Sequence, residues 1–422
     1  MKKIIFISFL ILGNIFSQVE QSHGKMPYSY YPTFYFDVAT YKIDNSNKSR
    51  VDVFVQVPYS SVQFVKTGDT YLAKYSVSVG FSLDDNLVIE RVWNEEVISN
   101  DFQETLSKLS NNYSYQNFEL IPGDYEIRCE VKDRDSKKNY VYDGKVIIND
   151  FATLPNLSSI IFISKRIQDK SEESIIPNTA RIITNKDSVI SFFYDINSDF
   201  ARTLKIEYKI KDKEEKKIFQ KEVECDVNVG ANTVYETIPQ MNLSIGEYEL
   251  FVILKDENGN TIIERKKSFL SQYLGIPTSI TDLDKAIDQM VYIALDDEID
   301  YIAEGKTREE KLERYLDYWK RKDPSPQTEE NEMMIEYYRR VAYANEKFGK
   351  YIDGWRSDMG MIYILLGPPD NVERHPFETD SKPYEIWDYY DIRQEFVFVD
   401  DTGFGEYRLL NWNYGDWYKF RY

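Results

Sequence analysis

The stretch between residues 354 and 389 concentrates side chains that can bind a ligand. Aromatic rings line sites for peptide segments and sugars, and charged groups beside them orient the bound molecule. We therefore predict a groove lined by Trp355, Tyr363, Trp387 and Tyr389, with Arg356, Asp358 and His375 at its rim. Because glycine and proline mark enforced turns, the backbone of this candidate site is set by Gly354, Ser357, Gly367, Pro368, Pro369 and Asp370.

Carboxylates in the same stretch suggest a different chemistry. Two of them, placed on either side of a glycosidic bond, would serve as general acid and general base. The candidates are Asp358, Asp370, Glu373, Glu385 and Asp388. Sequence spacing does not show that any two of them meet, and acidic residues are abundant throughout the chain. A glycan-cleaving protein is therefore the alternative and not the favoured reading.

Other reaction classes lack the residues that they need. The sequence holds two histidines, His23 and His375. A Ser-His-Asp triad would have to use His375, and no Gly-x-Ser-x-Gly turn accompanies it. A zinc site would need more His or Cys ligands, and the chain has no glycine-rich phosphate loop or dinucleotide fingerprint. We expect no metal, no cofactor and no catalytic residue.

The motif at residues 354–358 also has a purely structural interpretation. Asp358 would then cap a turn or pair with Arg356. Trp355 would fill the seam between helices and sheet, and Gly367-Pro368-Pro369 would end an edge strand. Burial of the Trp355 ring separates the two readings, since a buried ring fits a scaffold and a half-exposed ring fits recognition.

The elements around the candidate site change from helices to strands. From residue 275 apolar residues recur about every 3.6 positions, which predicts three helices whose apolar faces begin at Leu283, Leu312 and Met334. Strands are predicted at residues 361–366, 384–390, 395–399 and 405–412. Short polar connections suit an antiparallel meander with helices on one face. Residues 275–422 therefore read as an α+β domain.

An ordered series of motifs runs through this domain: Tyr318-Trp319-Lys320-Arg321-Lys322-Asp323-Pro324, Glu336-Tyr337-Tyr338-Arg339-Arg340, Gly354-Trp355-Arg356-Ser357-Asp358, Gly367-Pro368-Pro369-Asp370, Tyr384-Glu385-Ile386-Trp387 and Gly403-Phe404-Gly405. Through these motifs the domain resembles the GWxTD domain family of secreted bacterial proteins. Ser357 stands where the family name has Thr, so the hydroxyl is kept and a methyl group is lost. The family has no established activity, so the resemblance implies a domain type and no reaction.

Two all-β blocks precede this domain. Residues 27–150 and 155–271 each show about seven short runs of alternating apolar and polar residues, which predicts two β-sandwiches. Both blocks contain a Gly-x-Tyr strand start, at Gly123 and Gly246. This start resembles the tyrosine corner of immunoglobulin-like and fibronectin-like sandwiches, in which the hydroxyl bonds nearby backbone. The predicted fold is multidomain, with two such sandwiches followed by the α+β domain.

Three smaller features accompany the β blocks. Cys129 and Cys225 lie on alternating runs in different blocks, which predicts two buried free thiols. Asn258-Gly259 predicts a hairpin in preference to a calcium loop. Residues 101–109 form either a short helix or part of the strand pattern.

The amino terminus and the charge bear on location and partners. Residues 1–17 read as a signal peptide, with Lys2 and Lys3 before an apolar run that is shorter than the about 20 residues of a membrane span. The formal charge of −19 argues against nucleic acid as a partner. We expect an exported chain without a transmembrane segment after removal of residues 1–17. It would be periplasmic, outer-membrane-associated or secreted.

These observations favour a non-enzymatic interaction protein of the cell envelope. Its carboxy-terminal domain would dock on another envelope protein. The alternative is a glycan-binding or glycan-cleaving protein that uses the aromatic and acidic residues near the motif.

Overall fold

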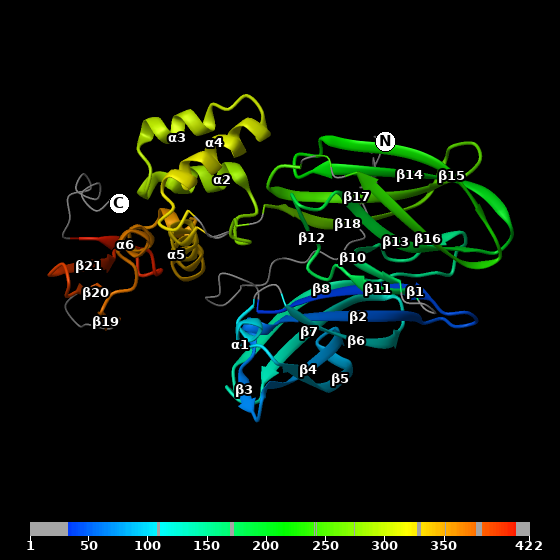
Figure 1. Cartoon of the computed structure of the whole chain (residues 1–422), viewed down its shortest axis with the longest axis horizontal. Helices are drawn as coiled ribbons and strands as arrows, with labels where there is room; N and C mark the ends of the chain where they lie inside the picture. The colour runs from blue at the N-terminus through cyan, green and yellow to red at the C-terminus, as the bar shows by residue number, and fades with distance from the viewer. Residues whose placement is uncertain are drawn as a thin grey trace, which may run out of the picture.

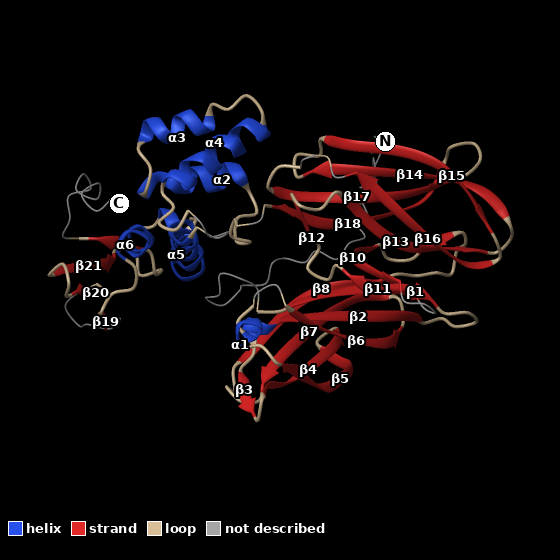
Figure 2. Ribbon diagram, in the orientation of Figure 1, coloured by secondary structure: helices blue, strands red, loops and turns tan. Residues whose placement is uncertain are grey.

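The computed structural model describes residues 33–107, 110–168, 173–239, 241, 243–273, 275–326, 331–350, 352–376 and 382–410. The predicted signal peptide at residues 1–17 and His23 lie outside this range. Most of the described chain is strand, and its helices gather in the carboxy-terminal third (Figure 2). Each third of the chain has a hydrophobic core of its own (Figure 1). No helix in the described residues is long and apolar enough to cross a membrane.

The first β region consists of two sheets over one core. One sheet has the order β1-β2-β6, with β1 (Tyr35–Lys42), β2 (Ser49–Pro58) and β6 (Asn111–Leu120). The other has the order β3-β4-β7-β8, with β5 also paired to β4; its strands are β3 (Phe64–Thr67), β4 (Thr70–Leu83), β5 (Asn86–Ser99), β7 (Gly123–Asp133) and β8 (Asn139–Ile148). The open choice at residues 101–109 is resolved as a short helix, α1 (Phe102–Thr105), and a single 3-10 turn spans Tyr59–Ser61.

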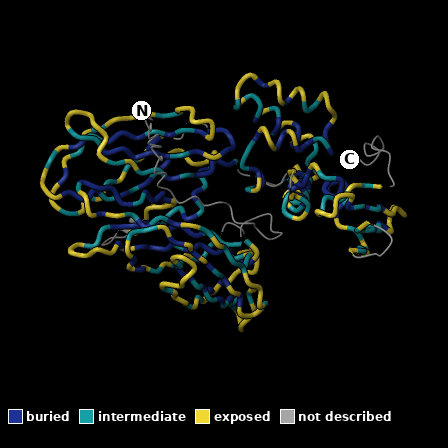
Figure 3. The backbone as a smooth tube through the Cα atoms, turned by 180° about the vertical axis from the view of Figure 1, so that it is seen from behind, coloured by how far each residue is buried: buried dark blue, intermediate teal, exposed yellow. Residues whose placement is uncertain are grey.

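The second β region repeats this plan. One sheet has the order β11-β10-β13-β16, with β9 paired to β13; its strands are β9 (Asn156–Leu157), β10 (Ile161–Gln168), β11 (Glu173–Pro177), β13 (Val189–Ser198) and β16 (Gly230–Pro239). The other has the order β12-β18-β17-β14-β15, with β12 (Ile182–Thr184), β14 (Arg202–Asp212), β15 (Lys217–Val227), β17 (Gly246–Lys255) and β18 (Thr261–Gln272). Buried residues lie mainly along the inner strands of both regions, whereas the turns and the outer strands β5 and β15 are largely exposed (Figure 3).

Two local predictions for the β regions are confirmed. The Tyr125 hydroxyl donates to the carbonyl of Ile121 at 3.0 Å, and the Tyr248 hydroxyl donates to the carbonyl of Ser244 at 3.1 Å. Both strand starts therefore carry the predicted bond from hydroxyl to nearby backbone. The β17–β18 hairpin turns at Gly259, whose φ of 85° is readily adopted only by glycine.

The prediction of two buried free thiols is half right. Both cysteines are free, and Cys129 is buried. Cys225 is only partly buried because β15, which carries it, is an edge strand of its sheet.

The two β regions are joined through β1. Two hydrogen bonds connect Thr40 and Ser159: Thr40 N donates to Ser159 Oγ at 2.9 Å, and Ser159 N donates to Thr40 O at 3.0 Å. Beside them the Lys267 ammonium donates to the buried Asp37 carboxylate at 2.5 Å. These contacts place the sheets of the two regions side by side (Figure 1).

The carboxy-terminal region contains the helices α2 (Leu283–Asp288), α3 (Asp296–Ala303), α4 (Arg308–Arg321), α5 (Glu332–Phe348) and α6 (Asp358–Leu366), with 3-10 turns η2 (Gln289–Tyr292) and η3 (Gly354–Arg356). Its sheet has the order β19-β20-β21-β22, with β19 (Asn371–His375), β20 (Tyr384–Tyr389), β21 (Gln394–Asp400) and β22 (Tyr407–Leu409). The antiparallel pairing of the three later predicted strands is confirmed, whereas α3 and β19 were not predicted. Residues 411–412 of the last predicted strand lie outside the described residues.

The predicted strand at residues 361–366 is wrong. These residues form most of α6, and Gly367-Pro368-Pro369 ends this helix and not an edge strand. The physical reason is burial, because every residue from Asp358 to Leu365 is buried. A helix covered on all sides shows no 3.6-residue alternation, so its apolar run has the appearance of a buried strand.

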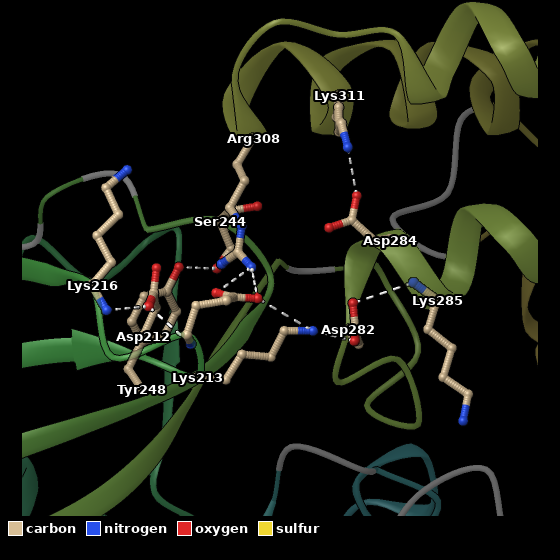
Figure 4. A network of polar contacts seen from close by, with 11 residues as sticks. Asp212, Lys213, Lys216, Ser244, Tyr248, Asp282, Asp284, Lys285, Arg308 and Lys311 are labelled. Carbon is tan, nitrogen blue, oxygen red and sulfur yellow. Dashed lines mark hydrogen bonds and ion pairs between the residues drawn. The ribbon is translucent and has the colours of Figure 1, made fainter.

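Charged residues join the second β region to the helices (Figure 4). Arg308 at the start of α4 contacts both oxygens of Glu214 at 2.9 and 3.0 Å, and Lys213 pairs with Asp282 at the start of α2. Beneath them Ile245 packs into the same hydrophobic core as Ile276. The helical region is therefore built directly against the edge of the second β region.

Candidate functional site

Two glycines let the motif turn pack closely on its surroundings. A Cβ added to Gly354 would lie 1.9 Å from the carbonyl oxygen of Ala344 in α5. A Cβ added to Gly360 would lie 2.0 Å from the carbonyl oxygen of Gly354. The turn thus lies against the backbone of both α5 and α6, at a separation that no other residue type permits.

Trp355 fills the space behind this turn. Its ring is only 5% exposed and meets Tyr292 edge to face at 6.4 Å. Its backbone N–H donates to Asn345 Oδ1 at 3.1 Å, and its carbonyl accepts a bond from the Tyr292 hydroxyl at 3.0 Å. The Arg356 guanidinium lies 4.6 Å from the ring centroid, on the outer side of the turn. This burial favours the structural reading for Trp355.

Ser357 and Asp358 share the start of α6. Ser357 Oγ accepts a bond from Gly360 N at 3.0 Å and donates to Gly354 O at 2.7 Å, so the serine caps the helix. The predicted cap residue was Asp358. The Asp358 carboxylate instead reaches across to the sheet, where it accepts a bond from Leu409 N at 2.8 Å.

The other end of α6 is held by Gly367. Its φ of 82° turns the chain out of the helix, and its carbonyl accepts a bond from the Tyr389 hydroxyl at 2.8 Å. The Arg340 guanidinium donates to the carbonyls of Ile364 and Leu365 at 3.1 and 3.3 Å, where a cation is favoured by the helix dipole. After Pro368 and Pro369, the Asp370 carboxylate accepts a bond from Tyr390 N at 2.7 Å.

A groove of about 370 Å³ lies between α5, the start of α6 and the small sheet. We call it the motif groove. Four aromatic rings line it. The rings of Tyr343 and Tyr363 stack with their centroids 4.1 Å apart, and the centroids of Phe348 and Trp387 lie 5.5 Å apart. The charged residues of its lining are Lys347, Lys350, Arg374, Arg408, Asp358, Glu385 and Glu406. Cationic side chains thus gather at an aromatic floor in a chain of strongly negative charge.

The structure brings together only part of the predicted site. Tyr363, Trp387, Ser357, Asp358 and Pro369 line the motif groove. The remaining predicted residues lie outside its lining: Gly354, Trp355, Arg356, Gly367, Pro368, Asp370, His375 and Tyr389. His375 stacks on Tyr384 at 4.4 Å on β19.

Several lining residues were missed by sequence reasoning. Tyr343 and Phe348 lie on α5, whose apolar stripe was interpreted as core. Arg374 and Arg408 face the groove from β19 and β22. Arg374 lies two positions after Val372, which also lines the groove, but β19 was not among the predicted strands, so this alternation gave no signal.

The acidic residues considered for catalysis are engaged in structural bonds. Asp358 and Glu385 are the two of the five that line the groove. Asp358 accepts the Leu409 N–H, and Glu385 pairs with Arg374 at 3.2 Å. Burial raises the pKa of the Tyr363 hydroxyl, against the opposing effect of Arg339. No cluster of metal-ligating side chains occurs among the residues that the structure describes.

A sequence model of one family matches residues 251–409 and is described as the GWxTD domain. The chain contains a GWxTD domain. The match begins within β17, 24 residues before the start predicted from the motifs, at residue 275. The core residues of β17 and β18 pack in the second β region, whereas Ile245, just before β17, packs into the helical core.

No curated protein matches the chain. Among solved structures, red sea bream transglutaminase is similar with 8% identity and a TM-score of 0.19 over 56% of this chain and 31% of that one. A putative beta-galactosidase from Bacteroides fragilis has 11% identity and a TM-score of 0.21 over 51% and 32% of the two chains. A beta-glucuronidase from Bacteroides uniformis has 10% identity and a TM-score of 0.20 over 52% and 26%. The chain spans at most about a third of each, and such TM-scores carry no argument about fold or function.

Proposed function

We propose that this protein is a non-enzymatic interaction protein of the cell envelope whose GWxTD domain binds a peptide segment of another envelope protein. The motif groove carries the proposal, since it combines a stacked aromatic floor with charged side chains around it. Protein interfaces are enriched in aromatic residues and arginine. Its volume of about 370 Å³ suits a few residues of an extended chain.

The charge of the groove favours a segment that contains acidic residues. Lys347 lies in the last turn of α5 and Lys350 just beyond its end. Arg374 and Arg408 line the groove from the sheet, where they pair with Glu385 and Glu406 of the same lining. A carboxylate of the bound peptide would gain charge-assisted hydrogen bonds from the arginines. Because the rest of the chain is strongly acidic, this attraction is local to the groove.

The remaining parts of the chain would position this domain. We assign the two β regions, 27–150 and 155–271, to immunoglobulin-like or fibronectin-like sandwiches on the basis of their tyrosine corners. The third domain would extend over 275–422. With residues 1–17 as a signal peptide, the protein would act in the periplasm, at the outer membrane or outside the cell.

The test is site-specific photo-crosslinking in cells. A photoreactive amino acid at position 350, at the exposed rim of the groove, should crosslink to one acidic segment of one envelope protein. The charge reversals Arg374→Glu and Arg408→Glu should abolish that crosslink without lowering the melting temperature. A photoreactive residue at position 382, which is exposed, precedes β20 and lies outside the groove lining, is the matched control. Crosslinks that survive both reversals would show that the groove is not the docking site.

A further inference from the structure

A second groove lies between the two β regions, far in sequence from the GWxTD motif. Along β2 and β13 alternate residues enter the cores, so the intervening residues point away from them. Ala39, Tyr41 and Ile161 close the space between the two outward faces at one end. Beyond them the faces leave a cavity of about 550 Å³, lined mainly by Tyr41, Arg50, Asp52, Phe54, Tyr113, Tyr115, Thr179, Phe193, Asp195, Thr233 and Tyr235. We call it the inter-sheet groove.

Each wall of this groove presents a pair of aromatic rings. On one wall the ring centroids of Phe54 in β2 and Tyr115 in β6 lie 5.4 Å apart. On the other wall the ring centroids of Phe193 in β13 and Tyr235 in β16 lie 5.7 Å apart. Tyr115 and Tyr235 are 45% and 46% exposed. The exposed parts of these rings, which belong to two different sheets, offer apolar surface to a ligand in the groove. The Arg166 guanidinium lies 4.6 Å from the Tyr235 ring centroid and covers part of that ring.

Polar groups with defined orientations lie between these rings. Asp52 is buried, pairs with Arg50 at 3.1 Å and lies 3.4 Å from the Tyr115 hydroxyl. The Arg50 guanidinium in turn lies 4.5 Å from the Tyr41 ring centroid. On the opposite wall Asp195 accepts a bond from the Thr233 hydroxyl at 2.7 Å. Both walls thus offer a carboxylate as an acceptor.

One buried hydroxyl of the lining has no partner. Thr179 is only 2% exposed, and its Oγ1 makes no hydrogen bond to any residue in the described parts of the chain. A buried hydroxyl without a partner costs roughly 1–3 kcal/mol. This oxygen is itself buried, so the cost belongs to the packing of the lining and is not a measure of ligand binding.

We propose that the inter-sheet groove binds a neutral oligosaccharide. The apolar CH faces of pyranose rings pack flat on aromatic rings, and their hydroxyls both donate and accept hydrogen bonds. The carboxylates of Asp52 and Asp195 only accept, so the ligand has to bring donors. A proline-rich peptide, the other common occupant of aromatic grooves, lacks backbone N–H at its prolines and meets this need poorly. The net charge of −19 disfavours acidic glycans and nucleic acid.

The junction between the β regions keeps the groove open in advance of binding. The exchange of bonds between Thr40 and Ser159 and the buried Asp37–Lys267 pair hold the two sheets at one angle. A preformed site avoids the entropy loss of ordering its walls when the ligand binds.

The test is a glycan array followed by titration calorimetry with the full chain. The probes are neutral hexasaccharides of β-1,3- and β-1,4-linked glucose, β-1,4-linked mannose, α-1,4-linked glucose and N-acetylglucosamine. We expect at least one to bind, and Tyr115→Ala or Tyr235→Ala to weaken that binding about tenfold or more. Tyr115→Phe, which keeps the ring, should retain most of the affinity. Tyr301→Ala, at an exposed tyrosine of α3, is the matched control.

The readouts separate the possible outcomes. Unchanged melting temperatures of the variants establish that a loss of binding is local, as the exposure of both rings predicts. The proposal is overturned if no neutral glycan of the array binds, or if binding is the same in both alanine variants. It is also overturned if a proline-rich peptide binds in place of a glycan and is lost in the same variants. None of these results depends on what the motif groove binds.

Discussion

The carboxylate of Asp358 accepts a hydrogen bond from the backbone N–H of Leu409 at 2.8 Å, although 51 residues separate the two in the chain. Asp358 is 6% exposed and opens α6, and Leu409 belongs to β22. This bond joins the last strand of the small sheet to the buried helix, beside the motif groove. Asp358 therefore has a structural role that does not depend on what the motif groove binds.

Replacing Asp358 should destabilise the GWxTD domain. Asp358→Ala removes the charged acceptor of a partly buried N–H and is expected to cost roughly 1–3 kcal/mol of unfolding free energy. Asp358→Asn keeps one oxygen and should cost less. Chemical denaturation checks both, with Asp391→Ala in the exposed turn before β21 as control. Equal stability of Asp358→Ala and the native chain would contradict the assignment.

Gly360→Ala should be destabilising, although the same change is favourable in an open helix. Alanine is preferred over glycine by about 1 kcal/mol at helix positions without hindrance. Here the new Cβ would lie 2.0 Å from the Gly354 carbonyl oxygen, so the motif turn has to move away from α6. Overpacking of this kind costs about 1–3 kcal/mol or more. A melting temperature of Gly360→Ala above that of the native protein would contradict this prediction and show that the motif turn can move at little cost.

The buried ion pair between Asp37 and Lys267 should stabilise the junction of the two β regions. Burial lowers the pKa of Lys267, and Asp37 opposes that effect, so the lysine depends on this carboxylate. Asp37→Ala is expected to cost about 3–5 kcal/mol. The double variant Asp37→Leu with Lys267→Met should be more stable than Asp37→Ala, as measured by denaturation. Asp401→Ala, which breaks the exposed Lys382–Asp401 pair, should cost less than about 1 kcal/mol.

Asp400 should make the rim of the motif groove sensitive to acid. Burial alone would raise the pKa of this carboxyl, but N–H donors from Gly405 and Gly403, at 2.6 and 2.9 Å, outweigh it and lower the pKa. A carboxyl whose pKa is lowered by folding stabilises the fold above its unfolded pKa of about 3.9, and this contribution is lost as the pH falls through the folded value. Asp400→Asn should therefore be less stable than the native chain at pH 7.

The pH dependence of that difference is the decisive measurement. The gap in unfolding free energy between native protein and Asp400→Asn should stay constant above about pH 5 and narrow steadily below about pH 4. Parallel curves for the two proteins over this range would exclude the proposed contribution of Asp400.

Much of the architecture could be predicted from sequence because its signals are local. The Gly-x-Tyr starts of β7 and β17 led to the hydroxyl bonds of Tyr125 and Tyr248, and the Asn258-Gly259 pair led to the hairpin. The error at α6 arose from periodicity alone. A helix was nevertheless readable from its ends, since Ser357 is a good cap residue and Gly367 followed by proline is typical of a helix terminus.

The sites were harder to predict because they depend on how distant segments pack. The motif groove needs α5 and β22 to meet, and nothing in the sequence places Tyr343 beside Arg408. The inter-sheet groove depends on the docking of two β regions, and the alternation of β6 and β16 marks Tyr115 and Tyr235 only as outward-facing. Only the tertiary structure decides whether an outward-facing side chain lies in solvent, against a partner or in a groove.

The reach from Asp358 to Leu409 has a consequence for biosynthesis. Helix α6 is nine residues long and far too short to persist by itself in water. Its first carboxylate finds its partner only after residue 409 has left the ribosome. The two β regions can complete their sheets while translation continues, whereas the GWxTD domain has to wait until β22 has been synthesised. A nascent chain that stalls before residue 409 would expose the apolar surface of α6, which is the kind of surface that chaperones and proteases detect.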